Sequence, residues 1–153
     1  MNAIHLYRLG RWFHERRSFF VAKLIRNLIF LLFNSYIPPS ANIGQGTIFA
    51  YGAIGVVIHA DARIGEGCVI GQGVTIGAAE GYVSREKNAC PSIGDHCYLG
   101  AGAKILGGIR VGSGCQIGAG AIVLRDLPDH AIAVGVPARI IGQTSPDYRA
   151  IRS

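Results

Sequence analysis

Charged and aromatic residues are scarce in this sequence. Asp, Glu, Lys and Arg together make up 16% of the 153 residues, and Phe, Trp and Tyr make up 8%. Half of the residues are nevertheless hydrophobic, which excludes the polar, highly charged composition of a disordered chain. The 22 glycines indicate many tight turns between short apolar segments. The length suits one domain with a small appendage.

The sequence also lacks an apolar run that could cross a membrane. The longest candidate, residues 19–33, is shorter than the roughly 20 residues that a span requires, and Lys23 and Arg26 interrupt it. No small-residue cleavage site follows it, so we expect no secretory signal and a cytoplasmic location. We expect two helices instead, over residues 3–16 and 18–33, with Ser18 as the N-cap of the second.

Basic residues are concentrated near the N-terminus. Residues 1–35 hold Glu15 as their single acid, whereas the remainder of the sequence is nearly balanced in charge. A local excess of this kind does not indicate nucleic-acid binding, so we expect no nucleic-acid partner. We expect the two helices to pack on a neighbouring element or on another subunit; the alternative is peripheral contact with the inner face of a membrane. The basic residues of this region are Arg8, Arg11, Arg16, Arg17, Lys23 and Arg26.

Most of the chain follows an imperfect six-residue repeat. The first position is Ile, Leu or Val, usually followed by Gly, and the fifth is a small or β-branched residue. Each hexad supplies one short strand and one turn, and three hexads close a triangular coil. First-position side chains then point inward and stack from coil to coil, while backbone hydrogen bonds join the coils. The first positions are Ile37, Ile43, Ile58, Ile64, Ile70, Ile76, Ile93, Leu99, Ile105, Val111, Ile117 and Val123.

The repeat loses its register in two places. Phe49 and Ile58 are nine residues apart instead of six, and Ile76 and Ile93 are seventeen apart. Register breaks in a solenoid are where loops leave the coil, and such loops often carry function. The expected organisation is a helical segment (1–35), an all-β solenoid domain (36–142) and a loose polar tail (143–153).

The four cysteines show no C-x-x-C spacing that would indicate a zinc or redox motif. Cys68, Cys97 and Cys115 fall on the fifth hexad position, where the coil requires a small residue. Cys90 lies outside the register at the end of the longer break. It either packs on the edge of the coil or lines an active site.

His59 follows Ile58 at a position where a corner glycine would otherwise stand. A corner side chain projects away from the packed interior. His59 is therefore either a structural corner residue or the general base of a catalytic site. The histidines lack a spacing that would bring three of them to one metal ion, so we expect no metal cofactor.

These motifs resemble the hexapeptide-repeat acyltransferases, and most closely their serine acetyltransferase-like branch. The resemblance covers about residues 36–142. It is carried by segments 37–44, 99–107 and 133–142, which read IPPSANIG, LGAGAKILG and AVGVPARIIG.

The resemblance implies a left-handed parallel β-helix, a homotrimer with active sites between subunits, and acetyl-CoA as the co-substrate. The pantetheine arm of the donor would lie along the coils, where small residues let it approach the backbone. Ala101 and Ala119 match family positions that touch the donor. Further donor-binding candidates are Gly77, Gly102, Gly120 and Arg139.

The mechanism implied by the family is general-base catalysis. A histidine takes the proton of the acceptor hydroxyl as it attacks the thioester, and backbone N–H groups stabilise the oxyanion without a covalent enzyme intermediate. This sequence departs from serine acetyltransferases at the site. Tyr36 replaces an Asp, segment 49–55 (FAYGAIG) holds no histidine, and segment 88–91 (NACP) replaces a D-R-H-P loop.

Segments 49–59 and 89–91 instead resemble acetyltransferases of surface-polysaccharide gene clusters. We therefore expect O-acetylation of a sugar hydroxyl of a polysaccharide or its precursor, with His59 as the base and Asp61 orienting its ring. Tyr51 and Cys90 would line the cleft. The alternatives are a serine O-acetyltransferase of cysteine biosynthesis and a catalytically inactive β-helix that scaffolds a partner.

Overall fold

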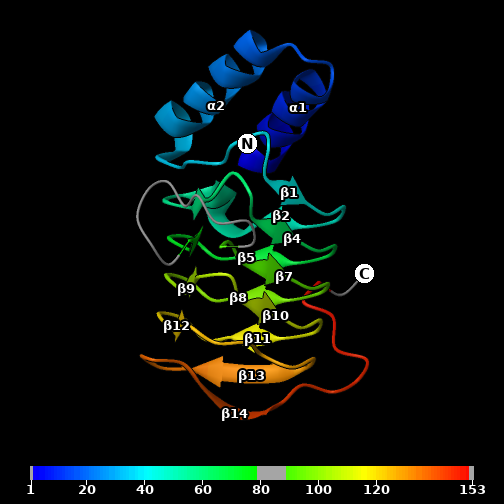
Figure 1. Ribbon diagram of the computed structural model, residues 1–153, viewed down its shortest axis with the longest axis vertical. Coiled ribbons are helices and arrows are strands. Elements are labelled where there is room, and N and C mark those ends of the chain that lie inside the picture. The colour runs from blue at the N-terminus through cyan, green and yellow to red at the C-terminus, as the bar shows by residue number, and fades with distance from the viewer. Residues whose placement is uncertain (1, 79–88, 152–153) are drawn as a thin grey trace.

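The computed structural model describes residues 2–78 and 89–151 and shows two helices above a stack of short strands (Figure 1). Helix α1 (Ala3–Glu15) begins after Asn2, whose side-chain oxygen accepts the backbone N–H of Ile4 at 3.1 Å. Helix α2 (Phe19–Phe33) begins after Ser18, as predicted, but the Ser18 side chain makes no capping hydrogen bond. Neither helix of the described chain combines the length and the hydropathy of a membrane span.

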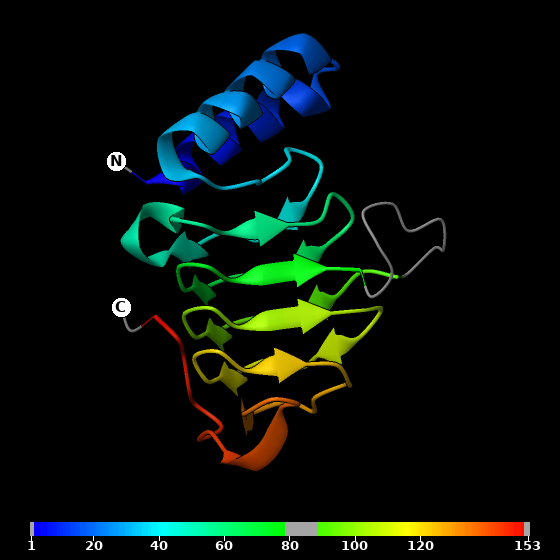
Figure 2. The ribbon, with the colours of Figure 1, turned by 90° about the vertical axis from the view of Figure 1, so that its left-hand side faces the viewer.

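Below the helices, successive strands belong in turn to three sheets, so that the chain winds in stacked coils (Figure 2). The strand orders are β1-β4-β7-β10, β2-β5-β8-β11-β13-β14 and β3-β6-β9-β12. The strands pair in parallel, except β13 with β14, so the predicted stack of short parallel strands is confirmed. The strands are β1 (Asn42–Ile43), β2 (Ile48–Phe49), β3 (Val57–Ile58), β4 (Arg63–Ile64), β5 (Val69–Ile70), β6 (Thr75–Gly77), β7 (Ser92–Ile93), β8 (Tyr98–Leu99), β9 (Lys104–Leu106), β10 (Arg110–Val111), β11 (Gln116–Ile117), β12 (Ile122–Val123), β13 (Ala131–Val134) and β14 (Arg139–Gln143).

The interior of the coil is filled by the first and fifth hexad positions. Ile58, Ile76 and Ile105 lie in register on β3, β6 and β9, and none of them is exposed to solvent. Fifth-position residues such as Val74 and Ala103 are equally buried. Both positions therefore point inward, as the repeat predicts.

The cysteines at the fifth position also join one coil to the next. The thiol of Cys97 donates to the Gly112 carbonyl at 3.1 Å, and that of Cys115 donates to the Pro128 carbonyl at 3.1 Å. The backbone N–H of Cys97 in turn donates to the sulfur of Cys68 at 3.4 Å. Cysteine suits this position because it combines a small volume with a weak hydrogen-bond donor.

The corners between sheets need glycine because the coils stack closely there. A Cβ atom on Gly65 would lie 2.6 Å from the carbonyl carbon of Gly94 in the next coil, and one on Gly44 would lie 2.5 Å from that of Gly65. A methyl group does not fit at such distances. This close approach explains why Gly so often follows the first-position aliphatic residue.

The first register break forms a short 3₁₀ element, η1 (Ala50–Ala53), in which Tyr51 and Gly52 have positive φ angles. The predicted loop of the second break falls largely on residues 79–88, which lie outside the described residues. Gly77, at the end of β6, and Cys90, just before β7, border that segment.

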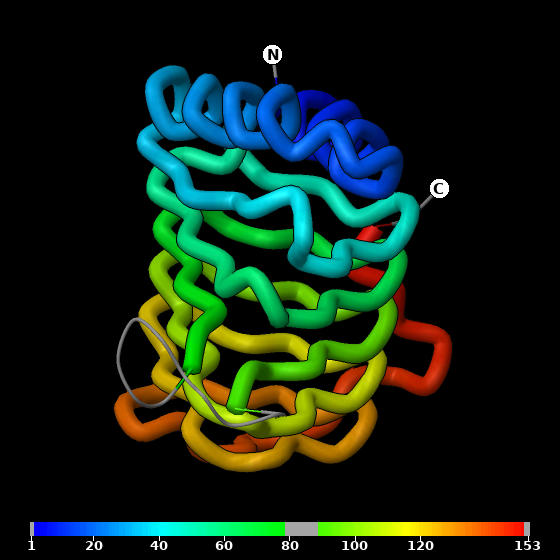
Figure 3. Tube along the Cα trace, turned by 45° about the horizontal axis from the view of Figure 1, so that its top comes forward, coloured from blue at the N-terminus to red at the C-terminus, as the bar shows by residue number. Residues whose placement is uncertain are grey.

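The C-terminal part of the predicted solenoid is not a coil. β14 returns antiparallel to β13 and closes the end of the stack, and the chain then runs back along the outside of the coils (Figure 3). β14 includes Gln143, one residue beyond the predicted boundary. Thr144, which we expected in a loose tail, is anchored: its N–H donates to the His130 carbonyl at 2.7 Å and its hydroxyl to the Gly114 carbonyl at 2.8 Å.

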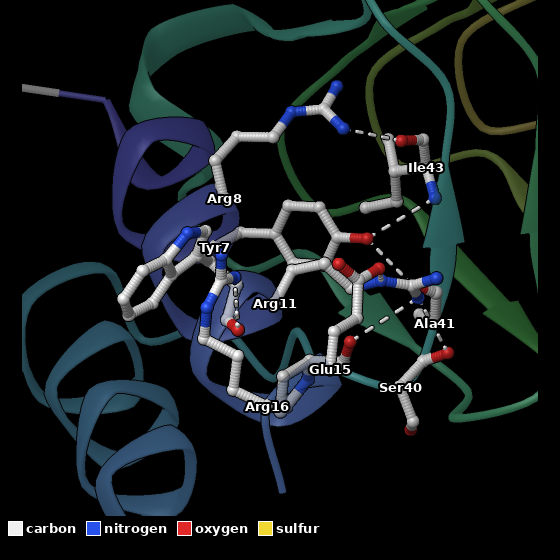
Figure 4. A network of polar contacts seen from close by, with 10 residues as sticks. Tyr7, Arg8, Arg11, Glu15, Arg16, Ser40, Ala41 and Ile43 are labelled. Atoms are coloured by element: carbon white, nitrogen blue, oxygen red, sulfur yellow. Dashed lines mark hydrogen bonds and ion pairs between the residues drawn. The ribbon is translucent and has the colours of Figure 1, made fainter. Parts of the chain in front are cut away.

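Helix α1 is fixed to the first coil by a polar network (Figure 4). The hydroxyl of Tyr7 donates to the Ala41 carbonyl at 2.6 Å and accepts the N–H of Ile43 at 3.3 Å. The guanidinium of Arg8 donates to the Ile43 carbonyl at 2.6 Å, and that of Arg11 donates to the Ala41 carbonyl at 2.9 Å. Two of the basic residues near the N-terminus therefore have a structural role.

Candidate active site

His59 stands at the corner that follows β3. Its backbone N–H donates to the carbonyl of Ile76 on β6 at 2.8 Å, which continues the β3–β6 ladder by one residue. The His59 side chain leaves the coil at this point and retains 20% of its exposure to solvent. The corner thus presents an imidazole that is held at its backbone and is partly exposed to solvent.

Cys90 is brought to His59 from 31 positions further along the chain. Its Sγ atom lies 3.0 Å from Nδ1 of His59, and both side chains are partly buried. Burial, and then the negative charge of Asp61, raise the pKa of the Cys90 thiol. Cys90 is therefore a protonated thiol at neutral pH, able to donate a hydrogen bond to the ring.

Asp61 contacts the same ring nitrogen, mainly through its backbone. The Asp61 N–H donates to Nδ1 of His59 at 3.2 Å, whereas its carboxylate oxygen Oδ2 lies 3.8 Å from Nδ1. The carboxylate is 80% exposed. Sequence reasoning proposed the carboxylate as the group that orients the imidazole; the shorter contact belongs to the amide.

These contacts define two tautomers of His59. With the proton on Nε2, Nδ1 accepts both the Asp61 amide and the Cys90 thiol. With the proton on Nδ1, the ring loses the hydrogen bond from the Asp61 amide and donates toward the Cys90 sulfur or the Asp61 carboxylate, and the lone pair of Nε2 becomes available as a base. None of the hydrogen bonds between described residues involves Nε2, so within that part of the chain the nitrogen has no competing hydrogen-bond partner.

The same three side chains could hold a metal ion. The ligand atoms of His59, Asp61 and Cys90 all lie within 4.8 Å of one another. An imidazole, a thiolate and a carboxylate are a donor set that suits zinc. Sequence reasoning searched for three histidines and missed this mixed set, because Cys90 is distant in sequence. The expectation that no metal is used stays a prediction.

Gly77 lies beside His59 at the same end of the β3-β6-β9-β12 sheet. It follows Ile76, the partner of Ile58, and its carbonyl accepts the N–H of Gly107 at 2.9 Å. A Cβ atom on Gly77 would meet only Leu106 Cδ2, at 3.9 Å. Close stacking of the coils therefore does not require a glycine at position 77, although it does at the corners.

Four of the six predicted donor-binding residues lie at the corner before the same sheet. Ala101 and Gly102 connect β8 to β9, and Ala119 and Gly120 connect β11 to β12 one coil later. The Gly120 N–H donates to the Ala101 carbonyl at 2.8 Å, which stacks the two corners. A Cβ atom on Gly102 or Gly120 would meet nothing within 4 Å, so both face open space, although their φ angles of +70° and +68° also favour glycine.

Two further predicted residues are exposed on other elements. Tyr51 is 77% exposed on η1, at the corner before β3, and no hydrogen bond between described residues links it to His59, Asp61 or Cys90. Arg139 is exposed at the start of β14, and among the described residues its guanidinium donates to the neighbouring Ala138 carbonyl, at 3.1 Å.

The chain resembles known enzymes in sequence over almost its whole length. The family described as "Bacterial transferase hexapeptide (six repeats)" matches residues 90–125. A serine acetyltransferase of Synechococcus elongatus is 39% identical over 140 residues, which are 92% of this chain and 56% of that enzyme. A serine acetyltransferase of Helicobacter pylori strain J99 is 38% identical over 141 residues, 92% of this chain and 80% of that enzyme.

The fold agrees with these sequence relationships. A solved structure described as serine acetyltransferase in complex with cysteine superimposes with a TM-score of 0.84 at 37% identity, covering 94% of this chain and 54% of that one. The chain belongs to the hexapeptide-repeat acyltransferase superfamily, in its serine acetyltransferase-like branch. It spans little more than half the length of several of the relatives that it matches.

The comparisons contradict the sugar acceptor that the sequence led us to expect. The relatives at 37–39% identity over 92–95% of the chain are named serine acetyltransferases. The expectation rested on the missing family histidines and on the local resemblance of segments 49–59 and 89–91 to polysaccharide-cluster enzymes, and the overall similarity outweighs these local departures. The alternative stated above, serine as the acceptor, agrees better with these relatives.

Proposed function

We propose that this protein is an acetyl-CoA-dependent O-acetyltransferase that transfers the acetyl group to the hydroxyl of serine. The observation that carries the proposal is the similarity to serine acetyltransferases in both sequence and fold over more than nine-tenths of the chain. A solved relative described as a complex with CoA, matched with a TM-score of 0.80, supports acetyl-CoA as the donor. The proposal includes the left-handed sense of the coil.

His59 is the proposed general base. In the Nδ1–H tautomer its Nε2 atom takes the proton of the serine hydroxyl while the hydroxyl oxygen attacks the thioester carbonyl of the donor. The new ester bond forms as the carbon–sulfur bond breaks, and the proton passes from the imidazolium to the departing CoA thiolate. On the opposite side of the ring, the Cys90 sulfur, 3.0 Å from Nδ1, accepts the Nδ1 hydrogen bond. The Asp61 carboxylate, 3.8 Å from Nδ1, balances the positive charge of the imidazolium.

The donor is proposed to lie along the β3-β6-β9-β12 sheet. This sheet runs between the corner formed by Ala101 and Ala119 and the end where His59 and Gly77 lie. A pantetheine arm laid along it would place its small-residue contacts at the first corner and its thioester at the second. The open space above Gly102 and Gly120 supports this course.

A homotrimer is proposed because one chain forms only one wall of such a site. A depression of about 200 Å³ is lined by Asp61 and other residues of β1 and the β3–β4 corner, and His59 and Cys90 are not part of its lining. A neighbouring subunit would supply the second wall. Tyr51, which is exposed at the corner before β3, is the proposed contribution of that neighbour.

The test is release of free CoA from acetyl-CoA by the purified protein, with serine, threonine or a panel of sugars as the acceptor. Release that depends on serine supports the proposal. Release that depends on a sugar and not on serine would overturn the acceptor. Acetyl-CoA binding without turnover on any acceptor would favour the inactive scaffold.

A further inference from the structure

Helix α2 buries little of its apolar surface. Ala22, Ile25 and Ile29 are the buried residues of this helix, and they lie on the side that faces α1 and the coil. Phe20 and Leu31, on the opposite side, are each 80% exposed. The further large apolar side chains exposed on this helix are Phe19 (57%), Leu24 (59%), Leu28 (41%), Phe30 (57%) and Leu32 (48%). Exposed Lys23 and Asn27 lie one turn from Phe20 and Leu31, so the apolar surface is interrupted, but this many large apolar side chains exposed on one helix mark an interaction site.

The apolar face is bordered by unpaired positive charge. Arg16, Arg17 and Lys23, in the α1–α2 turn and the first turns of α2, are exposed, and α2 itself contains no Asp or Glu. The one acid of this region, Glu15, is engaged by Arg11 at 2.7 Å. No hydrogen bond or ion pair between described residues links Arg17 or Lys23 to an acid.

An aromatic residue lies at the same border. The indole of Trp12 is 46% exposed, and the guanidinium carbon of Arg16 stands 3.8 Å from the centre of its ring. Trp beside Arg and Lys, next to Phe and Leu, is the composition of a helix that lies at the interface of a membrane. Because neither described helix could span a bilayer, such a helix would lie in the plane of the surface.

The charges favour a lipid surface over a second copy of this chain. If two copies met through this face, Arg16, Arg17 and Lys23 of one would approach the same cations of the other, and the two helices offer no free acid to balance them. An anionic lipid surface supplies both the apolar layer and the negative charge, and each cation near it strengthens binding about fivefold.

The placement of the helices allows this contact. They form the end of the molecule opposite β13 and β14, so nothing in the coil obstructs a flat surface laid against them (Figures 1 and 2). Arg8 and Arg11 hold α1 to the first coil, so binding of the helices to a surface would also fix the position of the coil.

We propose that the outward face of α2, with the α1–α2 turn, docks the protein on an anionic lipid membrane. α2 lies in the plane of the surface with Phe20 and Leu31 in the apolar layer, and Arg16, Arg17 and Lys23 contact the headgroups. The coil projects away from the membrane. This inference is independent of the proposed activity, because no residue of α2 belongs to the candidate active site.

The test uses the full chain and vesicles of phosphatidylglycerol with phosphatidylcholine, against vesicles of phosphatidylcholine alone. Trp12 is the one tryptophan of the sequence and reports directly on the border of the face. We expect a blue shift of its emission and co-sedimentation with the anionic vesicles, both weakened by salt. Unchanged emission and no co-sedimentation with the wild-type protein would overturn the proposal without any variant.

Two variants of exposed leucine and isoleucine residues provide the matched comparison. Leu31→Ser should weaken vesicle binding at least tenfold, whereas Ile141→Ser, which changes a residue 66% exposed on β14, should leave it unchanged. Both variants should retain acetyl transfer to serine if the proposed activity is correct. Equal vesicle binding by Leu31→Ser and the wild type contradicts the inference. Loss of a larger assembly in Leu31→Ser, with no vesicle binding by the wild type, would show that another copy covers the face.

Discussion

The sulfur of Cys90 lies 3.0 Å from Nδ1 of His59, although 31 positions separate the two residues in the sequence. This contact places a thiol on the ring nitrogen that must carry the proton if Nε2 is to act as a base. The protonation state of Cys90 therefore influences which ring nitrogen of His59 carries the proton. The protonation state of Cys90 can be measured.

Cys90 should be the cysteine that reacts first under native conditions, and it should react slowly at neutral pH. Cys68, Cys97 and Cys115 are fully buried, whereas Cys90 is partly exposed. Burial and the charge of Asp61 raise the pKa of the Cys90 thiol, so the thiolate is scarce until the pH rises past the usual value of about 8.5. Alkylation by iodoacetamide, located by peptide mass spectrometry, measures this directly.

Asp61→Asn should speed that alkylation at neutral pH, because it removes the charge that raises the pKa of Cys90. Glu66→Gln, which neutralises an exposed acid that is not among the groups shifting this pKa, is the control and should leave the rate unchanged. Rapid alkylation of wild-type Cys90 at neutral pH, at the rate of a free low-pKa cysteine, would contradict the assignment of a protonated thiol.

Tyr7→Phe should lower the free energy of unfolding by about 1–2 kcal/mol. The substitution leaves the N–H of Ile43 without its 3.3 Å partner, while the Ala41 carbonyl keeps its bond from Arg11. Urea unfolding measures the change. Tyr98→Phe, which removes a hydroxyl with no hydrogen bond between described residues, is the control and should cost much less.

Tyr7 also predicts a loss of stability at alkaline pH. Burial raises the pKa of its hydroxyl, so the folded protein holds this proton more tightly than the unfolded chain does. The resulting contribution to stability is complete below the unfolded pKa of about 10 and is lost as the pH rises through the higher folded value. Tyr7→Phe should lack this part of the alkaline decline, and an identical decline in both proteins would exclude Tyr7 as its source.

Gly65→Ala should destabilise the coil by about 1–3 kcal/mol, because the added methyl group would lie 2.6 Å from backbone atoms of the next coil. Gly142→Ala is the matched control: its methyl group would meet only Ile132 Cδ1, at 3.9 Å. Equal unfolding midpoints for the two variants would mean that the coils do not stack as closely as described.

Ala119→Leu should raise the KM for acetyl-CoA on the order of tenfold, which corresponds to about 1.4 kcal/mol of lost binding. The larger side chain would stand at the corner where the donor is proposed to approach the backbone. Ser92→Leu adds similar bulk on the exposed face of β7, in a different sheet, and should leave the KM unchanged. If both substitutions are neutral, the donor does not use this corner.

The sequence predicted the coil well because its signal is local and repeated. Every sixth residue, such as Ile64, Ile70 and Ile76, has to be aliphatic to fill the interior, and the structure buries all three. The hairpin of β13 and β14 was not predicted, because the segment AVGVPARIIG lies beyond the last hexad at Val123 and was identified only through its resemblance to the family.

The site was predictable only in part. His59, Asp61 and Cys90 were each identified from their positions at register breaks, but their contact depends on how the chain returns to the coil before β7. The acceptor was wrongly predicted because the repeat builds the coil and does not bind the acceptor. The prediction therefore depended on local departures: the missing family histidines and the resemblance of segments 49–59 and 89–91 to polysaccharide-cluster acetyltransferases. The ring of His59 lies closer to the Asp61 amide than to the Asp61 carboxylate because of the path of the backbone, which a sequence motif does not predict.

The most direct test of the central claim is to identify the product by mass spectrometry after incubating the protein with acetyl-CoA and serine. The account predicts O-acetylserine with wild-type protein, and a loss of about 10²–10⁴-fold in its rate of formation for His59→Ala. The matched control His5→Ala, at an exposed position on α1, should keep the wild-type rate. O-acetylserine formed at the wild-type rate by His59→Ala, or none formed by the wild-type protein, would contradict the account.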